Sequence, residues 1–207
     1  VYHPEVETFE VFDEDGSYLG VLYTDFYPRS TKQGGAWMTS FKDQWITREG
    51  ENSRPHISLV MNFTRPTEST PALLTYDEVE TFLHEFGHAL HGLMANSRYE
   101  SLSGTNVYRD FVELPSQLME NWLPEQEFLE TFAHHHLTGE VLPDSLIQKI
   151  RNTQRYHVGY HCVRQLTFGM LDMAWHTQTE KIEDITAFEQ NAISPTQLLP
   201  VIDGTLI

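Results

Sequence analysis

The 207-residue chain has a single cysteine, Cys162, and few basic residues. One cysteine excludes an internal disulfide framework and a zinc cluster held by several thiolates. With 13 Lys and Arg against 30 Asp and Glu, the formal net charge is −17. That acidity argues against nucleic acid or an anionic membrane surface as the main partner. The sequence also lacks any apolar run near the roughly 20 residues that span a bilayer. Of the broad classes of protein, the composition leaves a globular chain that is long enough to bury a core.

The chain starts at Val1 rather than at Met, and it has no signal-peptide pattern. We therefore expect a segment of a longer protein. The missing secretion signal favours the cytoplasm as its location, with the periplasm as the alternative.

The first 70 residues have the pattern of a small β-sheet. Two strand-like stretches flank a turn that contains Asp15-Gly16, which is a hairpin signal. Arg29 and Lys32 follow in what we expect to be a solvated loop. The run at 57–63 is rich in apolar and β-branched residues, which predicts a central strand. The expected strands are 6–12, 18–27, 36–41 and 57–63.

After Pro71 the pattern becomes helical. Thr75 and Glu78 form the signature of a capping box, which predicts a helix from there to about Met94. Pro124 and Pro143 stand where first helical turns begin. Further helices are expected near 124–135, 143–152, 154–176 and 184–191, and Cys162 is expected to be buried within the third of these.

A sheet followed by helices predicts a mainly helical α+β fold. We expect one domain over 1–207. Its parts are a β-rich region at 1–70, a helical region at 75–193 and an irregular tail at 194–207.

The first helix contains the pattern H-E-x-x-H, formed by His84, Glu85 and His88. Residues four apart lie one turn apart on one face, so two imidazoles there can bind one zinc ion at about 2.0–2.1 Å. Glu85 is offset sideways, where it can act as general base on an activated water. The alternative is a solvated polar face that binds no metal. The apolar residues roughly opposite the histidines predict that this other face packs; they are Val79, Phe82, Phe86, Leu90 and Leu93.

Gly87 and Gly92 interrupt this helical pattern. Glycine inside a helix costs about 1 kcal/mol relative to alanine. Such a residue often indicates the close approach of another backbone, so we expect a packing contact there.

A catalytic zinc site needs a third protein ligand and one open position. His91 shares the histidine face, but a straight helix places it about 4.5 Å beyond His88 along the axis. We therefore expect His91 to be structural or to support the ligands. Glu113 is the better candidate, because 113 − 88 = 25 residues leave room for a loop and a returning helix.

Two further carboxylates accompany Glu113. Asp110 would accept a hydrogen bond from a zinc-bound histidine. Alternatively, Asp110 and Glu113 form only a capping box at the start of a helix. Glu120 lies seven residues after Glu113 and is a candidate for a supporting or structural carboxylate.

Together these segments resemble the thimet-oligopeptidase family of zinc metallopeptidases, specifically its dipeptidyl-carboxypeptidase and oligopeptidase A branch. The resemblance covers nearly the whole chain. Its central motifs are 82–91 (FLHEFGHALH), 103–105 (SGT), 110–117 (DFVELPSQ) and 120–122 (ENW), and its flanking segments are 34–38, 62–64, 138–140 and 171–176.

The resemblance implies a zincin-like catalytic core of the gluzincin type. It implies one zinc ion per chain, with His84, His88 and Glu113 as ligands and Glu85 as catalytic base and acid. It also implies hydrolysis of short peptides in a deep channel, by a peptidyl-dipeptidase or an oligopeptidase.

The sequence departs from the family pattern at both ends. Family members have a later Gly-rich stretch with paired tyrosines that resemble oxyanion donors, and a long helical N-terminal part. We find neither here, so we expect the N- and C-terminal parts of the parent protein to be missing. Loss of one oxyanion donor typically costs ~10²–10³ in rate, so we expect weak or no activity of the isolated chain. The alternatives are a zinc-dependent peptide-binding module without turnover and a structural module with incidental histidines.

Overall fold

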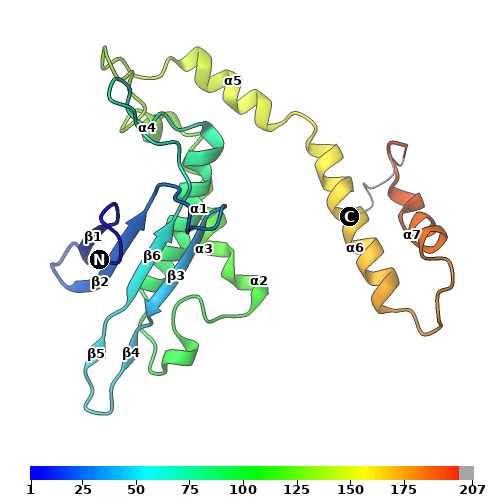
Figure 1. Cartoon of the computed structure of the whole chain (residues 1–207), viewed down its shortest axis with the longest axis horizontal. Coiled ribbons are helices and arrows are strands. Elements are labelled where there is room, and N and C mark those ends of the chain that lie inside the picture. Colours follow the sequence, from blue (N-terminus) through cyan, green and yellow to red (C-terminus); the bar gives the residue numbers. More distant parts are fainter. Residues whose placement is uncertain (201–207) are drawn as a thin grey trace. The chain divides into compact units, whose positions relative to one another are not determined.

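The computed structural model describes residues 1–200. The chain forms two compact units, of which the first is Val1–Pro143 and the second begins at Asp144. Figure 1 shows the elements in chain order, with strands first and helices after them. The predicted α+β class is therefore confirmed, whereas the single domain expected over 1–207 stays a prediction.

A four-stranded mixed sheet occupies the start of the first unit. Its order is β1-β2-β6-β3, so β6 is an inner strand. β1 and β2 form the expected antiparallel hairpin, β2 and β6 are parallel, and β3 is antiparallel to β6. A separate two-stranded ribbon precedes β6 and was not expected. The strands are β1 (Glu7–Phe12), β2 (Tyr18–Asp25), β3 (Trp37–Lys42), β4 (Trp45–Ile46), β5 (Asn52–Ser53) and β6 (His56–Val60).

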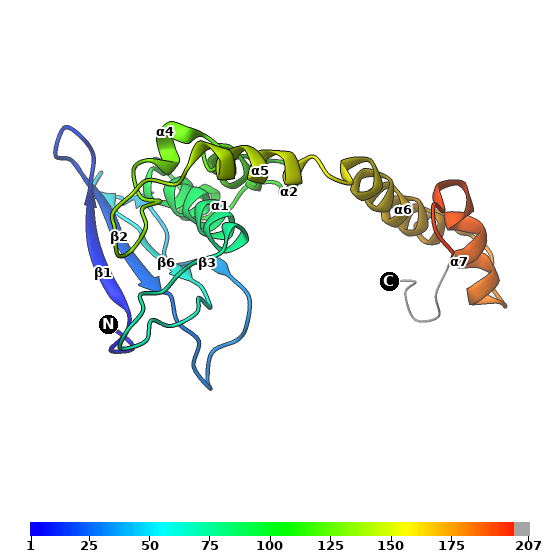
Figure 2. The same ribbon diagram turned by 90° about the horizontal axis from the view of Figure 1, so that it is seen from above.

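Helix α1 (Tyr76–Leu93) lies against one face of this sheet (Figure 2). The core between them consists of Leu22, Ile57 and Leu59 from the sheet and Ala89 and Leu93 from the helix. Burial of each larger side chain contributes about 1.5–3 kcal/mol. Of the apolar face expected from the sequence, Leu93 lies in this core and Phe82 and Phe86 pack against it, whereas Ala89 was not among the expected residues.

Both ends of α1 are fixed by hydrogen bonds. Thr75 and Glu78 form the predicted capping box, in which each side chain accepts a bond from the other residue's backbone N–H, at 3.2 and 2.8 Å. At the other end, the Arg54 guanidinium donates to the carbonyls of Leu93 and Ala95. The Leu93 carbonyl is one of the last four of the helix, which have no partner within it, and Ala95 follows directly after the C-cap residue Met94. Arg54, which lies between β5 and β6, therefore ties the end of α1 to the strands.

The chain then returns along α1. After a short 3₁₀ turn, η1 (Glu100–Leu102), come α2 (Arg109–Val112) and α3 (Leu114–Glu120), and α3 packs on α1. A Cβ atom on Gly87 would lie 2.5 Å from both Pro115 O and Ser116 Cα. The close backbone approach expected at this glycine is confirmed.

Two sequence expectations for the first unit were wrong. The helix expected over 124–135 is only α4 (Gln126–Leu129). Beyond it the backbone turns back, with a bridge between His134 and Val141 and a positive φ of 73° at Gly139. The loop expected to be solvated at Arg29 and Lys32 instead contributes both cations to the buried Asp25, and the Lys32 side chain is 2% exposed.

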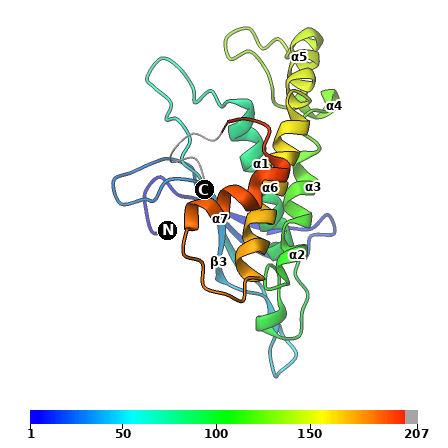
Figure 3. The ribbon, with the colours of Figure 1, turned by 90° about the vertical axis from the view of Figure 1, so that its right-hand side faces the viewer.

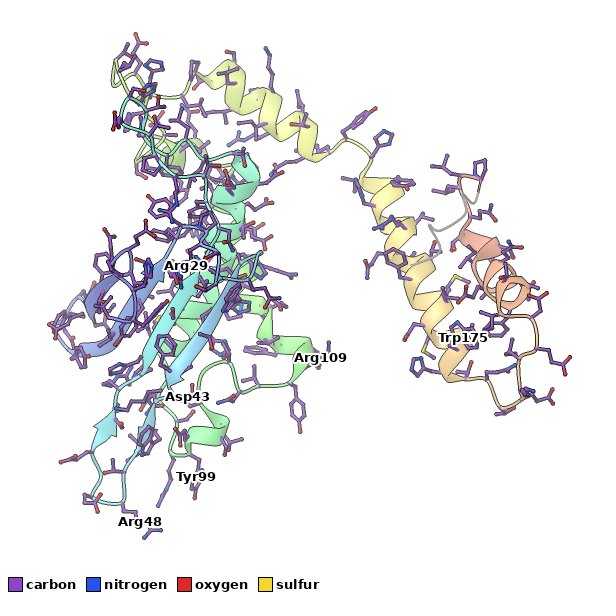
Figure 4. All side chains as sticks on the ribbon, in the orientation of Figure 1. Arg29, Asp43, Arg48, Tyr99, Arg109 and Trp175 are labelled. Carbon is purple, nitrogen blue, oxygen red and sulfur yellow. The ribbon has the colours of Figure 1, made fainter. Side chains whose placement is uncertain are left out.

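The second unit contains a helical pair. α6 (Val158–His176) packs on α7 (Ile185–Ile193), where the Trp175 and Phe188 ring centroids lie 4.5 Å apart. The two helices lie side by side in Figures 1 and 3, and Figure 4 labels Trp175. The unit begins with α5 (Asp144–Gln154) and continues after α7 with η2 (Ser194–Thr196).

Two expectations for this unit also need correction. The long helix begins at Val158 rather than near 154, because His157 adopts a left-handed conformation with φ 58°. Cys162 is exposed rather than buried. Within this unit α6 contacts α7 and η2, and Cys162 lies at a position of α6 that these two neighbours leave exposed. Of the expected irregular tail, 201–207 lies outside the described residues.

No helix in the described part of the chain has the length and apolar character needed to cross a bilayer.

Candidate metal centre

Helix α1 presents two histidines on the face that does not contact the sheet core. The His84 and His88 ring centroids lie 5.0 Å apart, and the rings are nearly perpendicular. Their side chains are 26% and 13% exposed, so both are partly sheltered without being sealed from solvent. The predicted one-turn spacing thus places both imidazoles at one site.

Glu113 joins them from the junction between α2 and α3. Its Oε2 atom lies 3.2 Å from His84 Nε2 and 3.1 Å from His88 Nε2. The three residues form a group whose candidate ligand atoms all lie within 4.8 Å of one another. A contact that spans 25 residues of sequence is therefore present in the folded chain.

These distances suit a divalent cation. Ligand atoms around a tetrahedral ion at 2.0–2.1 Å are about 3.3 Å apart. When both Nε2 atoms are unprotonated, the two imidazoles bring their lone pairs to within 3.2 and 3.1 Å of the same carboxylate oxygen. Such a set repels itself unless a proton or a cation lies between its members. Two His nitrogens and one carboxylate oxygen form a donor set that binds zinc and other borderline metals.

Glu120 orients the first histidine. Its Oε1 atom lies 2.6 Å from His84 Nδ1. Because a carboxylate only accepts, Nδ1 is the nitrogen that carries the proton. The Nε2 atom is then unprotonated in the neutral ring and faces Glu113. A carboxylate behind a metal-binding histidine commonly fixes the tautomer and raises ligand basicity.

Glu113 is held in its charged form. A hydrogen bond from the Ser116 hydroxyl lowers the pKa of its carboxyl, against the opposing effect of burial, and the two neighbouring histidines lower it further. The Ser116 Oγ atom lies 2.8 Å from Glu113 Oε2. Sequence reasoning did not single out Ser116, although its spacing of three from Glu113 is the signal that would have identified it.

Glu85 is next to this group on α1 and is buried, with 9% of its surface exposed. Within residues 1–200 we find no hydrogen bond or ion pair of its carboxylate. Every other carboxylate at the centre is engaged, Glu113 by Ser116 and Glu120 by His84. Glu85 thus differs from both of these carboxylates in having no partner among the described residues.

The two remaining candidates lie outside the ligand group. His91 Nδ1 is buried, and no described residue bonds to it. Burial, and next the neighbouring His88, lower the pKa of His91, which favours a neutral ring. Asp110 is exposed on α2, and among the described residues it contacts none of the three histidines of α1. The fold thus brings together His84, His88, Glu113 and Glu120.

Comparison with known proteins identifies the family. The family model described as Peptidase family M3 matches residues 1–202. The dipeptidyl carboxypeptidase of Escherichia coli (strain K12) is 42% identical over 98% of this chain and 30% of its own length. Oligopeptidase A of the same organism is 42% identical over 86% of this chain and 26% of its own. An organellar oligopeptidase A of Arabidopsis thaliana is 35% identical over 97% and 26%. The chain spans less than a third of each relative, and it belongs to peptidase family M3.

Proposed function

We propose that this chain carries the zinc centre of a peptidase that hydrolyses short oligopeptides, as a peptidyl-dipeptidase or an oligopeptidase. The observation that carries the proposal is the convergence of His84 Nε2, His88 Nε2 and Glu113 Oε2 beside the buried Glu85. The peptide substrate is supported by relatives named dipeptidyl carboxypeptidase and oligopeptidase A.

In this proposal His84, His88 and Glu113 hold one zinc ion per chain, and Glu120 fixes the His84 tautomer. A zinc ion bound there would supply Lewis-acid activation of a water and of the scissile carbonyl. The position of the centre, on a helix beneath the sheet, supports a zincin-like core.

Glu85 performs the proton transfers. One oxygen of its carboxylate accepts the proton of the attacking water, and the same group then passes that proton to the leaving amine. The partial burial of His84 and His88 limits the access of bulk water to this step. General acid–base catalysis of this kind typically contributes 10²–10⁴-fold in rate.

The whole protein's activity requires more than these residues. Because the chain spans 30% of the dipeptidyl carboxypeptidase, we propose that the 207-residue chain alone binds zinc and cleaves peptides only weakly. The further partners are then the remaining parts of a full-length protein and short peptide substrates. The cytoplasmic location favoured by the sequence is part of the same proposal.

The test combines zinc content with peptide cleavage for the wild type, Glu85→Gln and Glu113→Ala. We expect the wild type and Glu85→Gln to hold one zinc ion each, and Glu85→Gln to lose at least about 100-fold in cleavage rate. Glu113→Ala should hold clearly less than one zinc ion, because only the two imidazoles remain as ligands. Glu127→Gln, an exposed change on α4, is the matched control and should alter neither measurement.

A wild type without zinc would contradict the proposal. Zinc binding without cleavage, in a version extended to the length of the relatives, would favour a peptide-binding module.

A further inference from the structure

We propose that Ser116 is the positioning residue of the metal centre, because its hydroxyl fixes the Glu113 carboxylate opposite the two histidines. This inference rests on the proposed function. It assigns to Ser116 an action on metal affinity through Glu113, with no contact to the metal or the substrate.

The first observation is the geometry at one oxygen atom. Ser116 Oγ lies 2.8 Å from Glu113 Oε2 and 2.9 Å from the Glu113 carbonyl oxygen, so its single proton is shared between two acceptors of the same residue. The Oε2 atom is the same oxygen that lies 3.2 and 3.1 Å from the two Nε2 atoms of His84 and His88. The hydroxyl therefore selects which carboxylate oxygen faces the histidines and in which orientation.

The second observation is a contrast in burial. Ser116 is completely buried, whereas the Glu113 side chain is 49% exposed. A half-exposed glutamate has several rotamers open to it, and ordering it costs conformational entropy. A bond from a rigid, buried hydroxyl restricts those rotamers before any metal arrives. Preorganisation of this kind raises affinity without adding a ligand.

The third observation explains why Ser116 is rigid. The backbones of α1 and α3 touch at Gly87, where a Cβ atom would lie 2.5 Å from Ser116 Cα. Gly87 lies directly before His88, so the backbone that carries Ser116 is held against the backbone that carries the histidines. The separation between the hydroxyl and the imidazoles is thus set by main-chain contact rather than by long side chains.

The experiment measures zinc dissociation constants by competition with a chelator dye. The variants are Ser116→Ala and the control Ser103→Ala. Ser103 is a buried serine of the same unit whose hydroxyl donates to Gln44 Oε1 at 3.1 Å, away from the metal centre. We expect Ser116→Ala to weaken zinc binding about 10- to 100-fold, the usual effect of losing a group that orients a ligand, and Ser103→Ala to change it less than about threefold.

A double-mutant cycle with Glu113→Ala separates positioning from general support of the fold. If Ser116 acts through Glu113, Ser116→Ala should have no further effect on the residual zinc affinity once Glu113 is alanine. The start of α3 should survive the change, because the Glu113 carbonyl keeps its bond from Gln117 N–H at 2.9 Å.

Two results would overturn the inference. One is a zinc affinity of Ser116→Ala equal to that of the wild type. That result would refute the role of Ser116 without affecting the proposed zinc centre. The other is an equal loss in the presence and absence of Glu113, which would make Ser116 a structural residue. Failure of the proposed function is distinguishable from both, because the wild type would then bind no zinc at all.

Discussion

Two carboxylates of the first unit have opposite surroundings. Asp25 ends β2, and its side chain is 3% exposed; it accepts bonds from Arg29 at 2.8 and 2.9 Å and from Lys32 at 3.0 Å. Glu113 is half exposed and faces two imidazoles. The charge of Asp25 is balanced by cations of the chain itself, whereas the centre around Glu113 has room for a cation from outside.

The different surroundings indicate different roles for the two carboxylates, since Asp25 stabilises the fold and Glu113 is placed to bind a ligand. The oxygens of Asp25 already accept hydrogen bonds from cations of the chain, so they are not open to a ligand. Asp25 therefore holds the end of β2 and the following loop together. A carboxylate whose neighbours are lone-pair donors is suited to a metal. Both clusters contain charged groups in one small region, and only the type of neighbour distinguishes their roles.

The largest expected effect is on stability, from Asp25→Asn. Removing one partner of a buried ion pair leaves the others uncompensated, and this typically costs 3–5 kcal/mol. We expect that loss in the free energy of unfolding, measured by urea titration. Glu5→Ala is the control, because it breaks a surface pair with Arg65 in which the Glu5 and Arg65 side chains are 37% and 43% exposed. Solvent screens such a pair, so the loss should be much smaller than for Asp25→Asn. An equal loss of unfolding free energy in Asp25→Asn and Glu5→Ala would show that the buried cluster around Asp25 stabilises the fold no more than a surface pair does.

The second effect concerns acid. Burial by itself raises the pKa of Asp25, but hydrogen bonds from Arg29, Lys32 and Tyr2 outweigh it and lower the pKa from 3.8 to about 2. A depressed folded-state pKa gives stability that is present above pH 3.8 and is lost as pH falls toward 2.

The shift corresponds to about 2 kcal/mol. Urea titrations at pH 5 and pH 2 should therefore show a larger loss for the wild type than for Asp25→Asn, by about that amount. Parallel losses in the two proteins would show that Asp25 titrates alike in the folded and unfolded states.

The smallest effect concerns the metal centre and involves Glu120→Gln. Glu120 Oε1 lies 2.6 Å from His84 Nδ1 and thereby keeps the proton on that nitrogen. Removing the carboxylate charge should weaken zinc binding about tenfold, equivalent to about 1.4 kcal/mol. Dye competition measures this directly, and the free energy of unfolding without metal should change little. An unchanged zinc affinity would mean that the bond does not orient the ring.

Local patterns predicted much of this molecule. The Thr75 and Glu78 capping box and the hairpin with Asp15-Gly16 in its turn depend on neighbours in sequence, and the structure confirms them. The central strand expected over 57–63 is present as β6 (His56–Val60), which ends three residues earlier. The spacing of His84 and His88 likewise follows from helical geometry.

Other features depend on contacts that the local sequence pattern does not reveal. The burial of Lys32 depends on Asp25 together with the carbonyl of Tyr27, a combination that a polar sequence does not reveal. The position of Ser116 depends on where α3 meets Gly87. The exposure of Cys162 depends on which positions of α6 its neighbours α7 and η2 cover. Glu113 was identifiable as a candidate only because of the resemblance and of the room that the intervening loop provides.

X-ray absorption at the zinc edge would identify the ligands of the proposed metal centre. With one equivalent of zinc added to the 207-residue chain, we expect two imidazole nitrogens and at least one carboxylate oxygen at about 2.0–2.1 Å. In His88→Ala one imidazole should disappear from the spectrum. A two-imidazole spectrum that persists in His88→Ala, or a wild type that binds no zinc, would show that His84, His88 and Glu113 do not form a zinc site.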